Sequence, residues 1–332
     1  MKKILLIAFI IGVGVAFYLG RALPLPEAVT YGVTFSYLYA EKTLGLDWKK
    51  VYVAMLDDLK IRKLRIPAYW SEIEKEEGKY DFANLDWQIR EAEKRGASII
   101  LVIGRKVPRW PECHEPAWVL ERPRGEQDQK LFQYIRTIMG RYKDNPDVSM
   151  WQVENEPYLP FGECPLFLPG VFEKEIALVK SLDSRPVLLT DSGELSIWAQ
   201  TYRRADVFGT TMYRTIWNTW TGTFTYPLPP GYFRMKRRIM EKLYGIKPMI
   251  VVELQAEPWA PTMPQETTLE EQYKSMDVNR FRKNVSYARN TAFDTFYFWG
   301  VEWWYWLGEK HGNWEIWNEA KELFKKNTSP VF

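Results

Sequence analysis

The chain has 332 residues, and 45 Lys and Arg against 42 Asp and Glu leave a formal net charge of only +3. Its 46% hydrophobic and 26% charged residues are typical of a folded protein, and so small a net charge gives no reason to expect a nucleic-acid partner. Two His and two Cys are too few for the usual zinc or di-metal hydrolase site. No Walker loop or GxGxxG motif follows an apolar run. We therefore expect no metal and no cofactor, and chemistry that depends on carboxylates.

The N-terminus carries a targeting segment. Two lysines precede an apolar run of 17 residues from Ile4 to Gly20, which is long for a signal-peptide core and short for a membrane-spanning helix. Because no A-x-A cleavage site follows, residues 1–21 are predicted to be an uncleaved signal-anchor, with a signal peptide as the alternative, and 22–29 a linker. The lysines would stay in the cytoplasm. Residues 30–332 would then be membrane-anchored outside it, or secreted if the segment is cleaved.

From residue 30 onward, short apolar runs alternate with amphipathic stretches. The predicted strands cover 30–35, 63–67, 98–103, 150–154, 186–190, 206–211, 249–253 and 295–299. The predicted helices cover 48–60, 84–95, 126–142, 171–182, 195–203, 232–244, 269–290 and 314–325. Eight such units predict an α/β fold, a single (β/α)8 TIM barrel preceded by the N-terminal hydrophobic anchor. A doubly wound sheet rarely needs eight units, and the continuous Val/Ile/Leu runs are typical of buried parallel strands.

Two carboxylates stand where the predicted strands end, which is where a barrel places its active site. Glu156 follows the fourth strand and Glu253 closes the seventh. An uncompensated carboxylate there is costly, so it tends to have a role or a partner. Two carboxylates facing across a cleft suit cleavage of a glycosidic bond. Glu257 is a rival for the second position, although it lies past the strand in a Pro-bearing loop, and Glu154 is predicted to be buried and paired beneath Glu156.

Three motifs, in the order in which they follow one another along the chain, resemble glycoside hydrolase clan A, the retaining TIM-barrel β-glycosidases. They are WQVENEP at 151–157, MIVVELQAEPW at 249–259 and SEIEKEEGKYDFANLD at 71–86. The resemblance extends to enzymes of the family 5, 39 and 42 types, and the motifs at 249–259 and 71–86 are closer to families 39 and 42. The histidines that many family 5 members carry after the third strand or near the sixth are absent here.

The resemblance implies a glycosidase that hydrolyses O-glycosyl bonds (EC 3.2.1) of β-linked glycosides or polysaccharides by double displacement. Glu156 matches the acid/base and Glu253 the nucleophile. Arg65, at the end of the second strand, matches an arginine of the clan, and its guanidinium would keep Glu253 ionised. The alternatives are a transglycosylase that remodels envelope glycan and, with less support, a non-catalytic carbohydrate-binding barrel.

Further residues are predicted to bind the oligo- or polysaccharide substrate. By the same resemblance, Asn155 would hydrogen-bond the sugar 2-hydroxyl, Tyr213 would donate to the nucleophile, and Trp299 would form the floor beneath the reacting sugar. Aromatic residues make up 16% of the chain. Because the apolar face of a sugar stacks on aromatic rings, Trp70 and Trp259 in loops after the strands are added as stacking candidates.

The two cysteines fall in the loops after the third and fourth strands, which are neighbours in a barrel. A disulfide between Cys113 and Cys164 would clasp these loops, and an extracytoplasmic compartment would allow it. Two free thiols are the alternative, because a pair of cysteines alone does not establish a bond.

Overall fold

The computed structural model of the chain describes residues 12, 14, 25–164 and 170–327. Apart from residues 12 and 14, the predicted signal-anchor at 1–21 therefore lies outside the described residues. Among the helices that are described, none is both long and apolar enough to cross a membrane.

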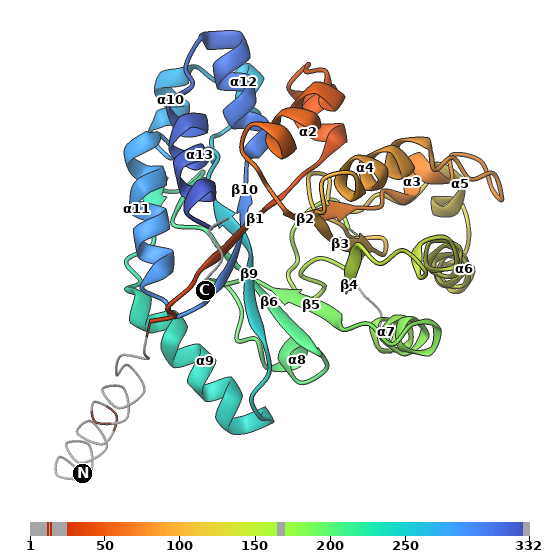
Figure 1. The fold of residues 1–332 in the computed structure, drawn as a ribbon. Helices are drawn as coiled ribbons and strands as arrows, with labels where there is room; N and C mark the ends of the chain where they lie inside the picture. Colours follow the sequence, from red (N-terminus) through yellow and green to blue (C-terminus); the bar gives the residue numbers. More distant parts are fainter. Residues whose placement is uncertain (1–11, 13, 15–24, 165–169, 328–332) are drawn as a thin grey trace.

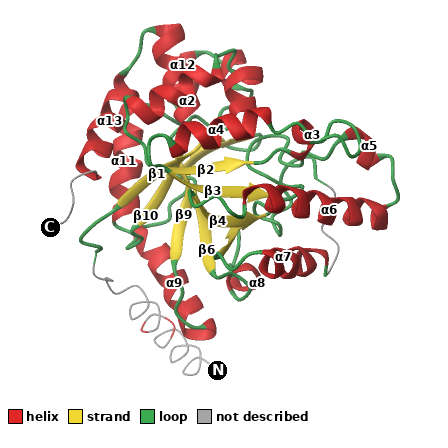
Figure 2. Cartoon of the chain, turned by 45° about the vertical axis from the view of Figure 1, so that its right-hand side comes forward, coloured by secondary structure: helices red, strands yellow, loops and turns green. Residues whose placement is uncertain are grey.

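Eight parallel strands close into a barrel, and helices surround it (Figures 1 and 2). Around the barrel the strands follow the order β1, β10, β9, β6, β5, β4, β3 and β2. Their bounds are β1 (Thr30–Thr34), β2 (Lys63–Pro67), β3 (Ser98–Ile103), β4 (Val148–Val153), β5 (Val187–Asp191), β6 (Val207–Met212), β9 (Met249–Gln255) and β10 (Thr295–Trp299). The predicted barrel is thus confirmed, and each predicted strand is present.

Alternation along the strands separates two apolar cores. Ile100, Leu188, Ile250, Val252 and Tyr297 belong to a small cluster formed by residues of the strands alone. The neighbouring positions on the same strands, such as Ile99, Leu101, Leu189 and Val251, belong to the large cluster shared with the helices. Since successive side chains point to opposite faces of a strand, the small cluster fills the barrel and the large one lies between barrel and helices.

The helices around the barrel correspond to the predicted ones, with two differences. They are α2 (Trp48–Asp57), α4 (Ala83–Glu93), α6 (Arg124–Tyr142), α7 (Val171–Leu182), α8 (Ala199–Tyr202), α9 (Pro230–Tyr244), α10 (Leu269–Tyr273), α11 (Val278–Arg289) and α13 (Glu315–Asn327). The helix predicted at 195–203 is reduced to α8, because Trp198 adopts a positive φ of 68° that stops a right-handed helix. The helix predicted at 269–290 is two helices, because Asp277 is extended and caps Arg280 N at the start of α11.

Several elements were not predicted. Helix α12 (Val301–His311) follows β10 directly, after Gly300 at φ 124°. The hairpin of β7 (Thr215–Asn218) and β8 (Gly222–Thr225) extends the loop after β6. The remaining elements are short, namely η1 (Tyr39–Thr43), α3 (Trp70–Ile73), α5 (Ala117–Leu120) and η2 (Pro264–Glu266).

A disulfide joins the loop after β3 to the loop after β4. Cys113 and Cys164 are bonded, with their Cα atoms 5.2 Å apart and a separation of 51 positions in the sequence. Of the two alternatives left open by the sequence, the structure has the disulfide. It holds together two loops at the end of the barrel where the carboxylates lie.

Candidate active site

The turn after β4 presents two glutamates with different surroundings. Both have positive φ, 59° for Glu154 and 45° for Glu156, a conformation that is uncommon and strained outside glycine. Glu154 accepts hydrogen bonds from the backbone N–H groups of Arg105 and Lys106 at 2.9 and 2.7 Å. A Cβ on Gly104 would lie 2.5 Å from the Glu154 carboxyl carbon, so this approach needs glycine. The prediction that Glu154 is buried and paired is confirmed.

Glu156 is buried at the mouth of the barrel and is held by β5 and β6. Its backbone N–H donates to the hydroxyl of Thr190 at 2.9 Å, and its Oε1 accepts from the hydroxyl of Thr211 at 3.0 Å. Burial raises the pKa of Glu156 well above its usual range, and the negative charges of Glu253 and Glu112 raise it further. Burial and the neighbouring charges therefore both favour the protonated form of this carboxyl group, which is the form that a proton donor needs.

Glu253 is buried on β9 between two donors. Arg65 Nη1 donates to its Oε1 at 2.8 Å, and the hydroxyl of Tyr213 donates to its Oε2 at 2.9 Å. The Cα atoms of Thr211 and Glu253 are partners in the β6–β9 pairing, and the Thr211 hydroxyl donates to Glu156. Thr211 in β6 therefore donates to Glu156 and Tyr213 just after β6 donates to Glu253, which places both carboxyl groups at the same end of the barrel.

Arg65 organises the floor of the site. Its guanidinium is fully buried and donates from Nε to Gln152 at 2.7 Å, from Nη2 to Asn155 Oδ1 at 2.7 Å, and to the Thr34 hydroxyl at 3.3 Å, in addition to Glu253. Because the fork is planar and rigid, these bonds fix the nucleophile candidate and the Asn155 amide relative to each other.

Glu257, the rival of Glu253, lies in a separate ion-pair network. It accepts from Arg109, whose Nη2 also donates to Glu302 at 2.9 Å. The Arg109 guanidinium lies over the rings of Trp299 and Tyr39, at 4.0 and 3.8 Å from their centroids. Trp299 is at the end of β10 as predicted, but only 8% of it is exposed because the arginine covers its ring. Glu257 has a structural partner that accounts for its burial.

A row of aromatic rings leads from Glu253 to the surface. Tyr213 contacts Trp259 at 5.2 Å between ring centroids, Trp259 contacts Phe161 at 5.8 Å, and Phe161 contacts Trp110 at 6.1 Å. Trp110 is 50% exposed. Trp259 therefore lies beside the carboxylates, in the region where the sequence predicted a stacking residue.

Trp70 is a correction to the predicted set. It begins α3 and has no exposed surface. Its indole N–H donates to Glu74 at 2.7 Å, and its ring stacks on Tyr134 of α6 at 5.1 Å. The ring packs in the large apolar cluster shared by the barrel and the helices, so neither of its faces is open to a sugar.

Two residues of the site were missed in the sequence. Thr211 precedes Tyr213 by two positions, and the period of two along a strand could have placed both on the same side. Glu112 is buried and accepts from Asn155 Nδ2 at 3.2 Å. Its only sequence signal was its position next to Cys113 in the loop after the third strand.

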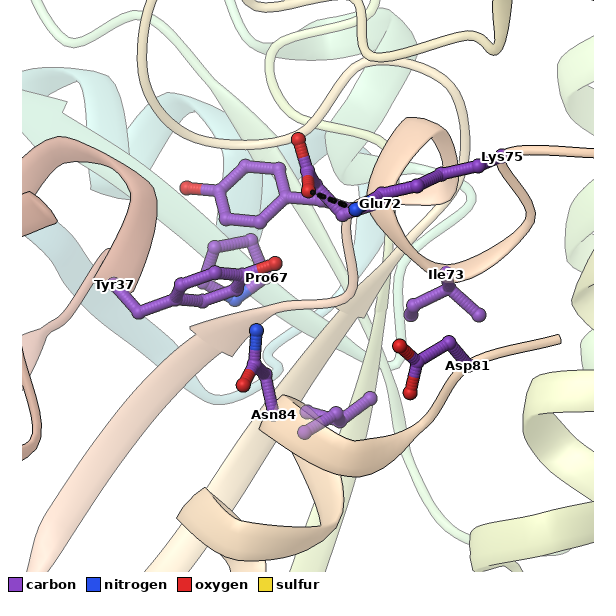
Figure 3. Close-up of a pocket in the computed structure, with 9 residues that line it drawn as sticks. Tyr37, Pro67, Glu72, Ile73, Lys75, Asp81 and Asn84 are labelled. Carbon is purple, nitrogen blue, oxygen red and sulfur yellow. Dashed lines mark ion pairs between the residues drawn. The ribbon is translucent and has the colours of Figure 1, made fainter. Parts of the chain in front are cut away.

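A small cavity at the end of β2 is distinct from this site. It is lined by residues of the β1 loop, α3 and α4, and Glu72 and Lys75 form an ion pair of 3.3 Å at its edge (Figure 3). Its volume of about 30 Å³ has room for one or two waters and none for a sugar ring. Neither Glu156 nor Glu253 lines it.

Comparison with known families connects the site to a class of glycosidases. Residues 39–164, which are 126 of the 332, match the family model Glyco_hydro_42, described as β-galactosidase. The matched segment contains the motif around Glu156 and ends before Glu253. Among curated proteins, the sequence has no match.

Solved glycosidases share the fold. A β-galactosidase from Rahnella sp. R3 superposes with a TM-score of 0.59 at 16% identity, over 93% of this chain and 57% of that one. A catalytic mutant of Gan42B, a GH42 β-galactosidase from G. stearothermophilus, gives 0.62 at 13%, over 91% and 57%. Xylanase 10B from Thermotoga petrophila RKU-1, in complex with xylobiose, gives 0.57 at 15%, over 95% and 97%.

These matches confirm the predicted resemblance to TIM-barrel glycoside hydrolases of clan A. Among the families named in the sequence analysis, they favour family 42. The chain spans little more than half the length of the two β-galactosidases. It spans nearly the whole length of the xylanase.

Proposed function

We propose that the chain is a retaining glycoside hydrolase that cleaves β-linked glycosides or polysaccharides. The observation that carries the proposal is the contrast between the two carboxyl groups at the strand ends. Burial and neighbouring negative charge raise the pKa of Glu156, whereas Glu253 accepts hydrogen bonds from a guanidinium N–H and a phenol O–H. Two neighbouring carboxyl groups with different surroundings, one poor in donors and one held by a cation and a phenol, are the pattern that assigns an acid and a nucleophile.

The first half-reaction forms a glycosyl-enzyme. Glu253 attacks the anomeric carbon, the bond from this carbon to the leaving oxygen breaks, and the leaving oxygen takes the proton of Glu156. Burial raises the pKa of Tyr213 well above its usual range, so its hydroxyl stays a donor to Glu253 and steadies the attacking group.

The second half-reaction releases the sugar. Glu156, now ionised, takes a proton from water while the water oxygen attacks the anomeric carbon and displaces Glu253. Thr211 favours the ionised form of Glu156 at this stage, since its hydroxyl donates to Oε1 at 3.0 Å.

Two variants test these assignments on aryl β-glycosides. Glu253→Gln should abolish turnover, and Glu156→Ala should slow it and be partly rescued by azide when the leaving group is good. Glu163→Gln is a matched control, because Glu163 is exposed in the loop after β4. Wild-type rates for both active-site variants would rule out the assignments.

Labelling separates Glu253 from its rival. A 2-deoxy-2-fluoro glycoside traps the nucleophile as a stable ester, and peptide mass spectrometry should locate it on Glu253. An ester on Glu257 would reverse the assignment. Products that carry an added sugar, in place of free sugar, would instead indicate the transglycosylase alternative.

The matched family and the solved relatives suggest the first substrates to try. We propose aryl β-galactosides and β-xylosides, followed by the corresponding oligosaccharides. The aromatic row from Tyr213 to Trp110 supports oligosaccharide binding, since each ring offers a surface for an apolar sugar face. Trp259→Ala should then raise KM for oligosaccharides more than for aryl monosaccharides.

We also propose that residues 30–332 act outside the cytoplasm, attached through the segment at 1–21. The disulfide supports this location, because structural disulfides form and persist in oxidising compartments. The N-terminal sequence of the protein recovered from membrane and medium fractions tests it. Membrane recovery with residue 1 retained supports the anchor, and recovery from the medium with the segment removed supports the secreted alternative.

A further inference from the structure

A carboxyl group from the loop after β3 lies next to the two proposed catalytic glutamates. Glu112 is only 6% exposed, and its Oε2 accepts from Asn155 Nδ2 at 3.2 Å. The double displacement described above gives it no task. A buried carboxyl group in a polar site tends to have a role or a partner.

The loop is built to hold Glu112 in this place. Its backbone N–H donates to the carbonyl of Arg109 at 2.7 Å, its carbonyl accepts from Val107 N at 2.8 Å, and its φ is 74°. The next residue, Cys113, pairs with Lys106 in a β-bridge and forms the disulfide to the loop after β4. The position of Glu112 is therefore fixed by both loops.

The partner loop is shaped around the same side chain. A Cβ on Gly162 would lie 2.6 Å from Glu112 Cβ and 2.7 Å from the carbonyl oxygen of Pro111. Glu163 N donates to the same carbonyl at 2.9 Å. Since only glycine allows so close an approach at φ 89°, the two loops fit together at Glu112.

The contact orients the Asn155 amide. Asn155 Oδ1 accepts from Arg65 at 2.7 Å and from Gln152 and Thr190 at 3.3 Å each, so its acceptor capacity is used within the protein. The Nδ2 group has two N–H donors, and one goes to Glu112. The second N–H is left to donate to a sugar hydroxyl.

We propose that Glu112 is a positioning residue of this site, which orients the Asn155 amide toward the 2-hydroxyl of the bound sugar. The inference rests on the proposed glycosidase function and extends it to a residue outside the catalytic pair. Without the carboxylate, the amide loses the acceptor that defines the direction of its donors. Because the bond to the 2-hydroxyl strengthens in the transition state, the loss should appear in catalysis.

Electrostatics add a second readout. Burial raises the pKa of Glu112 to about 7, the charge of Glu253 adds to the effect, and Lys106 and Arg65 oppose it. Glu112 in turn is one of the negative charges that raise the pKa of Glu156. Removing its charge should lower the pKa of Glu156 and move the alkaline limb of kcat/KM to lower pH.

The pKa of Glu156 also depends on other charged groups, which are the same in the wild type and in the Glu112 variants. Glu253 on β9 and Asp191 on β5 also raise the pKa of Glu156, and Lys106 lowers it. None of them is altered by a substitution at Glu112, so the shift of the limb reports the charge of this side chain.

The experiment compares aryl β-glycosides with and without the 2-hydroxyl. Glu112→Ala should lower kcat/KM by about 10- to 100-fold for the 2-hydroxy substrate and by less than roughly threefold for the 2-deoxy substrate. Glu112→Gln keeps an acceptor and loses the charge, so it should retain the discrimination and shift the alkaline limb to lower pH. Glu163→Gln removes an exposed carboxylate directly after Gly162 and should change neither the discrimination nor the pH profile.

The outcomes separate the inference from the function on which it rests. Equal losses for both substrates in Glu112→Ala, or an unmoved pH profile in Glu112→Gln, would overturn the role of Glu112 in an enzyme whose wild type is active. Calorimetric binding of a methyl β-glycoside and its 2-deoxy form covers the case in which the wild type has no turnover. A wild type without turnover would contradict the proposed function. If Glu112→Ala then bound the 2-hydroxy glycoside over its 2-deoxy form with the same ratio of affinities as the wild type, the positioning role would be overturned as well.

Discussion

Replacing Arg65 by methionine tests the central electrostatic contact of the site. The side chain keeps its length and loses its charge, so Glu253 remains buried without the guanidinium that donates to it at 2.8 Å. The same substitution removes a donor from Asn155 Oδ1. We expect both stability and turnover to fall.

The magnitude follows from the burial of the pair. Arg65 is 0% and Glu253 3% exposed, so solvent screens the pair little. At an effective dielectric constant of about 20, two unit charges about 4 Å apart attract by about 4 kcal/mol, and removing one partner of a buried pair costs about 3–5 kcal/mol. With an unfolding entropy of about 2.1 cal/mol/K per residue, a barrel of roughly 300 residues shifts by about 1.6 °C per kcal/mol, so the melting temperature should fall by about 5–8 °C.

The assay is thermal unfolding followed by circular dichroism, with two further variants. Adding Glu253→Gln to Arg65→Met removes the uncompensated charge, so the double variant should be about 1–3 kcal/mol more stable than Arg65→Met alone. Lys180→Met breaks an exposed pair with Asp206 and should cost less than about 1 kcal/mol. The reasoning is refuted if Arg65→Met has the melting temperature of the wild type, or if the double variant is no more stable than Arg65→Met.

Three other predictions concern the support of the site. Replacing Cys113 and Cys164 by serine should cost about 4 kcal/mol in urea unfolding without reductant, because the bond closes a long loop, and equal midpoints would show that the bond does not constrain the unfolded chain. Thr211→Val removes a donor to the Glu156 carboxylate, which should raise the already elevated pKa of Glu156 and move the alkaline limb of kcat/KM to higher pH; a shift to lower pH would contradict the geometry. Trp70→Phe should lower stability by about 1–3 kcal/mol through its lost indole hydrogen bond and leave KM unchanged, whereas a raised KM would return this residue to the substrate cleft.

The strands could be predicted because their signal is local. A buried parallel strand needs a run of apolar, often β-branched residues, and 63–67, 98–103 and 295–299 were predicted with the bounds that the structure has. The helix at 195–203 failed for a reason that periodicity does not record, since Trp198 takes a left-handed conformation. Helix α12 was missed because it follows β10 after a single residue, without the loop that normally separates two elements.

The residues of the site also fall into those that the sequence could predict and those that it could not. Glu156 and Glu253 stand at strand ends and could be found by position, and Glu154 could be predicted as a buried, paired residue beneath Glu156. Glu112 could not, because its place depends on a loop held by a disulfide and on the close approach of Gly162. Trp70 was misassigned because the direction of a ring depends on the helix that carries it.

The sequence by itself determined the barrel, the order of its strands and the two carboxylates at the mouth, because apolar runs and abrupt acidic ends are properties of neighbouring residues. The tertiary structure makes the contacts between charges that lie far apart in the chain, including the pairing of Arg65 with Glu253 that the resemblance implied. Closure of the barrel brings Arg65 of β2 to Glu253 of β9, 188 positions apart. Glu257 instead forms an ion pair with Arg109 from the loop after β3. Partners so distant in the chain are chosen by strand register and loop packing, and no local pattern of residues encodes that choice.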